Sequence, residues 1–379
     1  MIYFDNSATT KPYPEVIDSF VKVSSEFFGN PSSLHGIGAQ AEKLLSQARS
    51  QIAELLGVRS SEVYFTSGGT EGNNLAIKGA ALANSGKGKH IITTATEHAS
   101  VYDAFSHLED SGFDITYLPV NQTGQIHLDD LLKAIRKDTI LVSVMHVNNE
   151  TGSIQPIEQI GKVLSSYDDI LFHVDHVQGI GKVPLEVNQA GIDLCTISGH
   201  KFHGLKGTGA LYIRDGVNLT PLFSGGSQES KIRSGTENVA GAVALAKALR
   251  ITKEKQQTDL DKLTAIRQLL WDGLRGIEGI EINSPLDGAS HILNFSVPGL
   301  KSEVFIHSLE EADLFVSTTS ACSSKKNTPS KTVMAMFANL ARAKSTIRIS
   351  LSYQNNQEEA KKALELIRET VNKLRMIMR

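Results

Sequence analysis

Two polar residues that each follow an apolar run have the chemistry to act on a nitrogen-containing ring. Lys201 lies in SGHKFHG, and Asp175 lies in HVDHVQG. A lysine held in a crevice at a strand end loses its proton readily and can attack a carbonyl carbon. A buried carboxylate needs a partner and can keep a ring nitrogen protonated. The alternatives are a lysine in a surface loop and an aspartate whose oxygens accept backbone N–H groups.

The turn SGGTEGNN (residues 67–74) is a candidate phosphate site, because it joins an expected strand to an expected helix. Its glycines permit a tight turn, Thr70 offers a hydroxyl, and the free N–H groups at a helix start attract anions. Ser198 and His200, beside Lys201, could contact the same phosphate. The alternative is an ordinary glycine turn with a threonine cap. No Gly-Lys-Ser/Thr follows, so the turn is not a Walker loop.

Three more residues extend this set. His98, in TEHAS, could stack on an aromatic ring and move protons near neutral pH. Thr236, in the turn RSGTEN, suits a second anion contact at a helix start. Arg348, in STIRIS, alternates with apolar residues, so it is either paired internally or points into a cleft, where it would grip a carboxylate with two hydrogen bonds.

Taken together, these groups call for a phosphorylated aromatic nitrogen ring, an aldehyde bound by a lysine, and a substrate carboxylate. Pyridoxal phosphate acting on an amino acid meets all three requirements, since a ring nitrogen kept protonated by Asp175 makes the cofactor an electron sink.

The elements that must position these residues alternate between strands and helices. Apolar strands are expected at residues 62–66, 89–94, 114–120, 139–147, 170–175, 193–199 and 209–214, with helical patterns at 70–83, 100–112, 127–135 and 156–167. This alternation predicts an α/β fold with a mostly parallel sheet covered on both faces, and ligands bind such sheets outside the carboxyl ends of the strands.

After this region the pattern changes. A charged helix is expected at residues 251–275, followed by strands and helices that indicate a smaller α+β domain. We therefore expect a large cofactor-binding domain at residues 13–255. A small domain would comprise residues 1–12 and 256–379, with the long helix as the connector.

Composition excludes several classes of protein. The 379-residue chain has a formal net charge of -3 and 40% hydrophobic residues, so nothing indicates a nucleic-acid or membrane surface. Two cysteines do not make a disulfide framework. With no basic segment before an apolar run at the N-terminus, we expect no signal peptide and a cytoplasmic location.

The sequence resembles the cysteine desulfurases of the NifS/IscS type, a branch of the class V aminotransferases with the type I pyridoxal-phosphate fold. The likeness runs over nearly the whole chain, through the ordered motifs FDNSATTKP, FGNPSSLHG, FTSGGTEGNN, ITTATEH, MHVNNETG, HVD, SGHK, RSGTEN, SACSS and IRISLS. Many ordered motifs are far more specific than any single one.

The resemblance implies a role for each candidate. Lys201 would bind the cofactor covalently, Asp175 would pair with the pyridine nitrogen, and Gln178 would contact the phenolic oxygen. His98 would stack on the ring and assist proton transfer. Gly69, Thr70, Ser198 and His200 would hold the phosphate, and Thr236 would contact the phosphate of the neighbouring subunit in a homodimer. Asn149 would contact the cofactor and, with Arg348, the substrate carboxylate.

The resemblance also gives a role to the lone cysteine of SACSSKK. Cys322 would be the nucleophile that takes sulfur from L-cysteine as a persulfide, releasing L-alanine, and Lys325 and Lys326 would favour its thiolate. The sulfur would then pass to an acceptor protein for iron–sulfur cluster assembly or tRNA thiolation. Cys195, inside an apolar strand, is interpreted as core packing.

One departure from the family pattern is His176, which follows the ring aspartate where a small residue is usual. Three alternatives stay open. The first is a related enzyme, an ordinary class V aminotransferase or a selenocysteine lyase. The second is a metal protein built on His173, Asp175, His176, His200 and His203, although we expect no metal. The third is a catalytically silent binding protein, which His176 favours.

Overall fold

The computed structural model describes residues 1–318 and 328–378. Cys322, the expected nucleophile, lies outside the described residues, as do Lys325 and Lys326. Within the described residues, no helix is long and apolar enough to cross a membrane.

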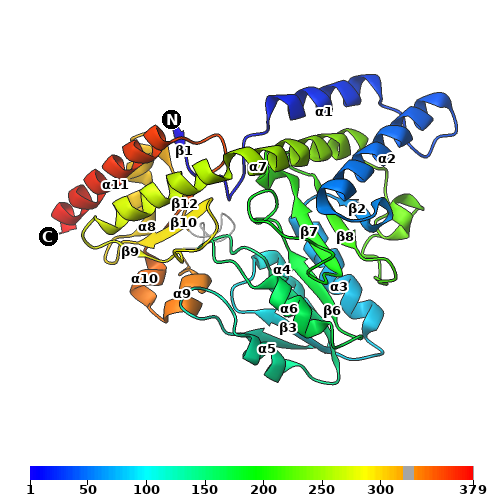
Figure 1. Cartoon of the computed structure of the whole chain (residues 1–379), viewed down its shortest axis with the longest axis horizontal. Coiled ribbons are helices and arrows are strands. Elements are labelled where there is room, and N and C mark those ends of the chain that lie inside the picture. The colour runs from blue at the N-terminus through cyan, green and yellow to red at the C-terminus, as the bar shows by residue number, and fades with distance from the viewer. Residues whose placement is uncertain (319–327, 379) are drawn as a thin grey trace.

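The larger part of the fold is built around a seven-stranded sheet (Figure 1). Its strand order is β2-β8-β7-β6-β5-β3-β4, and only β8 runs antiparallel to its neighbours. The strands are β2 (Val63–Thr66), β3 (His90–Thr94), β4 (Asp114–Leu118), β5 (Thr139–Met145), β6 (Leu171–Asp175), β7 (Leu194–Ser198) and β8 (Gly209–Ile213). The prediction of an α/β fold with a mostly parallel sheet is confirmed.

Successive residues along these strands enter two different cores, because side chains alternate between the faces of a sheet. Ile91 and Leu141 pack with α3 (Gly69–Asn84) and α4 (Ala99–Glu109) on one face. Ile92 and Val142 pack with α5 (Leu128–Ala134) and α6 (Ile157–Leu164) on the other face. Burial on both faces explains why the strands read as continuous apolar runs.

Another core lies on the sheet face that also carries α5 and α6. It involves α1 (Pro14–Glu26), α2 (Gly36–Leu56) and α7 (Val239–Arg275). Helix α7 begins at Val239 rather than at residue 251, because its alanine-rich first turns favour a helix and Asn238 caps it by accepting from Gly241 N–H. Its second half packs in another core, with Leu263 to Leu274, so one helix joins both parts of the fold (Figure 1).

The smaller part contains a three-stranded antiparallel sheet, β12-β10-β9. The N-terminal strand β1 pairs in parallel with β11, so the first residues of the chain lie against this part. Its elements are β1 (Ile2–Tyr3), β9 (Glu281–Ile282), β10 (Ile292–Ser296), α8 (Ser302–Glu310), β11 (Leu314–Phe315), α9 (Lys331–Phe337), α10 (Leu340–Lys344), β12 (Thr346–Ser350) and α11 (Gln357–Met378). Three short 3-10 turns complete the chain, η1 (Ser60–Glu62), η2 (Gly199–Lys201) and η3 (Gln228–Lys231).

Candidate active site

A cavity of about 200 Å³ lies at the carboxyl ends of β5, β6 and β7. Ten of the twelve residues given roles above line it, namely Gly69, Thr70, His98, Asn149, Asp175, Gln178, Ser198, His200, Lys201 and Arg348. Its other lining residues are Ser7, Ala8, Asn73, Ser100, Met145, Val147 and Val177. The parallel strands end at one edge, which brings these distant residues together.

Lys201 is placed by the 3-10 turn η2, which follows β7 directly. Its Nζ donates to the main-chain oxygens of Ser7 at 2.6 Å and Ala8 at 2.9 Å. The N-terminal segment therefore forms one wall of the cavity. Sequence reasoning gave Ser7 and Ala8 no role, although both belong to the motif FDNSATTKP.

Asp175 ends β6 and is 6% exposed. Its Oδ1 accepts from Val177 N–H at 3.0 Å, and its Oδ2 accepts from Asn73 Nδ2 at 2.7 Å. The interpretation of an aspartate satisfied by backbone N–H groups holds for one oxygen only. The carboxylate is held by two donors, and it still faces the cavity.

The candidate phosphate turn (residues 67–74) leads into helix α3, whose N-cap is Gly68, and the φ of 147° at Gly68 favours glycine because side chains rarely adopt that backbone conformation. No side chain among the described residues caps this helix start, so its first N–H groups are left for another acceptor. A Cβ at Gly69 would lie 3.0 Å from Val177 Cγ2, so the glycine lets the turn close against the cavity wall.

Burial lowers the pKa of both His200 and His98. Burial, followed by the charge of Lys201, lowers the pKa of His200 to about 4. Burial is also the largest cause that lowers the pKa of His98, against the carboxylate of Asp175. His98 caps helix α4, where its Nδ1 accepts from Ser100 N–H at 3.1 Å.

Gln178 lies in the turn after β6, and its Nε2 donates to Ser7 O at 3.0 Å. Its Oε1 is buried and has no hydrogen-bond partner among the described residues. A buried amide oxygen without a partner is costly, and a ligand that donates to it would remove that cost.

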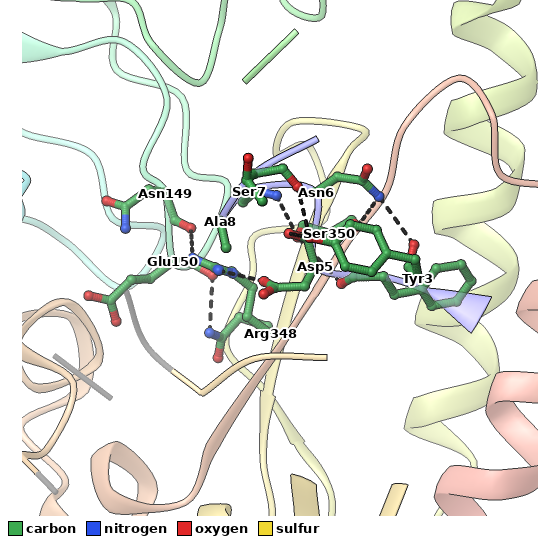
Figure 2. A network of polar contacts seen from close by, with 12 residues as sticks. Tyr3, Asp5, Asn6, Ser7, Ala8, Asn149, Glu150, Arg348 and Ser350 are labelled. Atoms are coloured by element: carbon green, nitrogen blue, oxygen red, sulfur yellow. Dashed lines mark hydrogen bonds and ion pairs between the residues drawn. The ribbon is translucent and has the colours of Figure 1, made fainter. Parts of the chain in front are cut away.

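Arg348 points into the network of Figure 2 from strand β12, and its side chain is 1% exposed. Its Nη2 pairs with Asp5 Oδ1 at 2.9 Å, and its Nη1 donates to Asn149 O at 2.9 Å. Its Nε is buried without a partner among the described residues. Both interpretations of this arginine therefore hold, because it is paired internally and also lines the cavity.

Thr236 does not line this cavity in the single chain. It lines a separate hollow of about 190 Å³ beside Arg233 and Asn238. Arg233 is tied to Glu71 of helix α3 by a 2.8 Å ion pair, so the Thr236 turn is anchored near the phosphate turn.

Two histidines of the metal interpretation, His173 and His176, contact other polar side chains. The ring nitrogens of His173 contact Ser143 and Thr196, and His176 Nδ1 lies 2.9 Å from His146 Nδ1. Among the described residues, no three His, Cys, Asp or Glu side chains gather in a group that could hold a metal ion. The geometry therefore gives the metal interpretation no support.

The donor set fits pyridoxal phosphate. An amine, a carboxylate and an arginine face the same cavity, and an uncapped helix start lies beside two hydroxyl residues, Thr70 and Ser198. The close approach at Gly69 and the unpartnered oxygen of Gln178 also fit a polar ligand held against the cavity wall.

Comparisons with known proteins cover nearly the whole chain. Residues 2–363 match the family model for class V aminotransferases. The chain is 48% identical over 363 residues to a "NifS/IcsS protein homolog" of Lactobacillus delbrueckii subsp. bulgaricus, covering 95% of this chain and 94% of that protein. It is 42% identical over 378 residues to "Cysteine desulfurase IscS" of Dictyoglomus turgidum, covering 99% and 96%. A solved "NIFS-LIKE PROTEIN" matches with a TM-score of 0.92 and 37% identity, covering 98% of this chain and 99% of that one.

Proposed function

The chain belongs to the class V aminotransferase family, and we propose that it is a pyridoxal-phosphate-dependent cysteine desulfurase that converts L-cysteine to L-alanine. The observation that carries this proposal is the meeting of Lys201, Asp175 and Arg348 in one cavity. The identity of the substrate, L-cysteine, is inferred from the names of the relatives.

When bound, pyridoxal phosphate supplies an electron sink that weakens the bond between carbon and sulfur in the substrate. Lys201 would hold the cofactor, and Asp175 would keep its ring nitrogen protonated. Gln178 would contact the phenolic oxygen, and His98 would stack on the ring. The phosphate would be held by Gly69, Thr70, Ser198 and His200.

Arg348 and Asn149 would orient the substrate carboxylate. Arg348 lines the cavity, its Nε has no partner among the described residues, and its buried setting strengthens a charge-assisted hydrogen bond. Such orientation keeps the reacting sulfur in one position, which is a large part of the catalytic advantage of a closed site.

Cys322 would be the nucleophile. Its thiolate would attack the substrate sulfur, forming a sulfur–sulfur bond, while the electron pair of the carbon–sulfur bond goes to carbon, which takes up a proton to give alanine. The persulfide on Cys322 would pass its terminal sulfur to an acceptor protein for iron–sulfur cluster assembly or tRNA thiolation.

The assembly that we propose is a cytoplasmic homodimer in which Thr236 contacts the cofactor phosphate of the neighbouring subunit. The anchored position of the Thr236 turn, outside the chain's own cavity, supports this role. We also propose the domain division given above, with residues 13–255 as the large domain.

The test is a visible absorption spectrum of the purified protein, followed by L-cysteine, a reductant and assays of alanine and sulfide. A yellow protein that forms both products in equal amounts supports the proposal. Cys322→Ser should keep the yellow colour and lose sulfide release. The matched control is Cys195→Ala, which alters the other cysteine, a 1% exposed core residue.

Four results would count against this function. A protein that stays colourless when pyridoxal phosphate is supplied would overturn the cofactor assignment. A yellow Cys322→Ser variant that still releases sulfide at the parent rate would overturn the assignment of Cys322 as the nucleophile. Alanine formed without sulfur on Cys322 would favour the selenocysteine lyase alternative, whereas a keto acid formed from cysteine in place of alanine would favour the aminotransferase alternative.

A further inference from the structure

Two residues without an assigned role connect His98 to Asp175. Asn73 lies in helix α3 and is 1% exposed, and Ser100 lies in the first turn of α4 and is 8% exposed. Asn73 Nδ2 lies 2.7 Å from Asp175 Oδ2 and 2.9 Å from Ser100 Oγ. Ser100 Oγ lies 2.9 Å from His98 Nδ1. The four side chains form one continuous hydrogen-bonded chain.

The direction of each hydrogen bond follows from the donors available. The backbone N–H of Ser100 donates to His98 Nδ1 at 3.1 Å, so Nδ1 carries no proton. Asn73 uses the two hydrogens of its amide nitrogen, one for Asp175 and one for Ser100. The reversed amide would place its oxygen against the carboxylate, which is repulsive. The hydroxyl hydrogen of Ser100 is then left for His98 Nδ1.

We propose that Asn73 and Ser100 are positioning residues that fix the Asp175 carboxylate and hold His98 as the tautomer protonated on Nε2. The inference rests on the proposed function, because it concerns how the cofactor's ring nitrogen and its stacking histidine are held. Its consequence is that His98 presents an N–H donor at Nε2, while Nδ1 takes up a proton only if its bond to the start of α4 breaks.

Burial supports this arrangement. His98 Nδ1 accepts hydrogen bonds from Ser100 and so carries no proton, and burial lowers the pKa of His98 in the same direction. Asn73 Oδ1 has no hydrogen-bond partner among the described residues. The fold therefore leaves one buried polar atom unsatisfied while both amide hydrogens are used, which favours a functional reason for this asparagine over a purely structural one.

The test compares Ser100→Ala and Asn73→Ala with Ser100→Thr, which keeps the hydroxyl, and with Asn84→Ala, a matched change at the far end of α3. The first readout is the 15N spectrum of the histidines in cofactor-free protein, with His98 assigned by a His98→Gln variant. Ser100→Ala keeps the backbone N–H donor but removes the hydroxyl donor at His98 Nδ1, so the Nδ1 signal should shift from its parent position, and Ser100→Thr should restore it.

The second readout is the affinity for pyridoxal phosphate, measured by absorbance without cysteine. Asn73→Ala should lose roughly tenfold, the order of one hydrogen bond to a charged group. Both alanine variants should lower kcat more than they raise KM. The inference is overturned if the His98 signals and the cofactor affinity match the parent and only thermal stability falls. If the parent itself binds no pyridoxal phosphate, the proposed function fails, and the tautomer measurement still decides the inference.

Discussion

Asp5, near the N-terminus, and Arg348, on strand β12 near the C-terminus, form an ion pair of 2.9 Å, and the arginine side chain is only 1% exposed (Figure 2). The main chain of Asp5 also bridges to Ser350 on the same strand as Arg348. The carboxylate therefore neutralises the arginine that faces the cavity, and a substrate carboxylate would meet a partner that is already paired.

We expect Asp5→Asn to lower KM for an amino-acid substrate by a few-fold, because Arg348 would regain its uncompensated charge. The variant should also lose roughly 1–3 kcal/mol of stability, since a buried charge without its partner is destabilising. Steady-state kinetics and thermal denaturation measure the two effects. The exposed Asp18→Asn serves as control, and a raised KM with unchanged stability would show that Asp5 orients Arg348 instead.

Glu97, next to His98, should make stability depend on pH. Burial is the main cause that raises its pKa to about 8, although Met145 N–H and Thr94 Oγ1 donate to one of its oxygens. Above the unfolded value of 4.5 the unfolded chain releases its proton while the folded protein keeps it, so the stabilising contribution of this group is lost from pH 4.5 to about 8.

Glu97→Gln removes that titration and mimics the protonated acid. Between pH 4.5 and about 8, the free energy of unfolding of the variant should rise relative to that of the parent by about 3–5 kcal/mol, since each pKa unit contributes about 1.4 kcal/mol. Chemical denaturation at several pH values measures the gain. Glu109→Gln, an exposed change, should show none. Parallel stability curves for the parent and Glu97→Gln would contradict the buried neutral acid.

His176 forms a buried pair with His146, and their Nδ1 atoms lie 2.9 Å apart. Burial lowers the pKa of His146 to about 4 and that of His176 well below its usual value. Both rings are neutral in the fold. As pH falls below about 6.5, the unfolded chain takes up protons that the folded protein excludes, so stability should fall with pH.

His176→Ala should cost about 1–3 kcal/mol at pH 7.5, because it leaves a cavity and an unpaired His146 nitrogen. The cost should shrink from pH 6.5 downwards, since the variant has one fewer buried imidazole to protonate. Denaturation of the parent, His176→Ala and the exposed His107→Ala measures this. A cost that is constant with pH would mean that His176 takes up its proton equally in the folded and unfolded states, and would contradict the buried neutral pair.

Lys182 is 4% exposed and donates to the main-chain oxygen of Lys201 at 2.9 Å. Burial, followed by the charge of Lys201, lowers its pKa to about 7. Between about pH 7 and the unfolded value of 10.5, the unfolded chain holds a proton that the folded protein has released, so the parent should gain stability as pH rises.

Lys182→Met should lack this gain, so its stability relative to the parent should be highest at pH 7 and fall by roughly 3–5 kcal/mol towards pH 10.5. The control is Lys133→Met, whose side chain is 79% exposed. A Lys182→Met variant whose pH dependence matches the parent would show that the ammonium stays charged in the fold.

Local features of the sequence determined the fold class and most of the candidate site. Continuous apolar strands, glycine turns and polar residues at strand ends predicted the parallel sheet and placed Asp175, His98 and Lys201 at its carboxyl edge. These signals are local, because side-chain alternation and the backbone freedom of Gly68 depend on a few neighbouring residues. The motif order also predicted the family, which the family model confirms.

Only the tertiary structure decided which residues hold the predicted ones in place. The Asp5–Arg348 pair joins residues 343 positions apart, and the Asn73–Asp175 bond joins residues 102 apart. Lys201 meets Ser7 and Ala8 in the same way. Such contacts depend on strand register, helix packing and the burial of each polar atom. No short stretch of sequence encodes these properties, because they arise only when distant segments exclude water together.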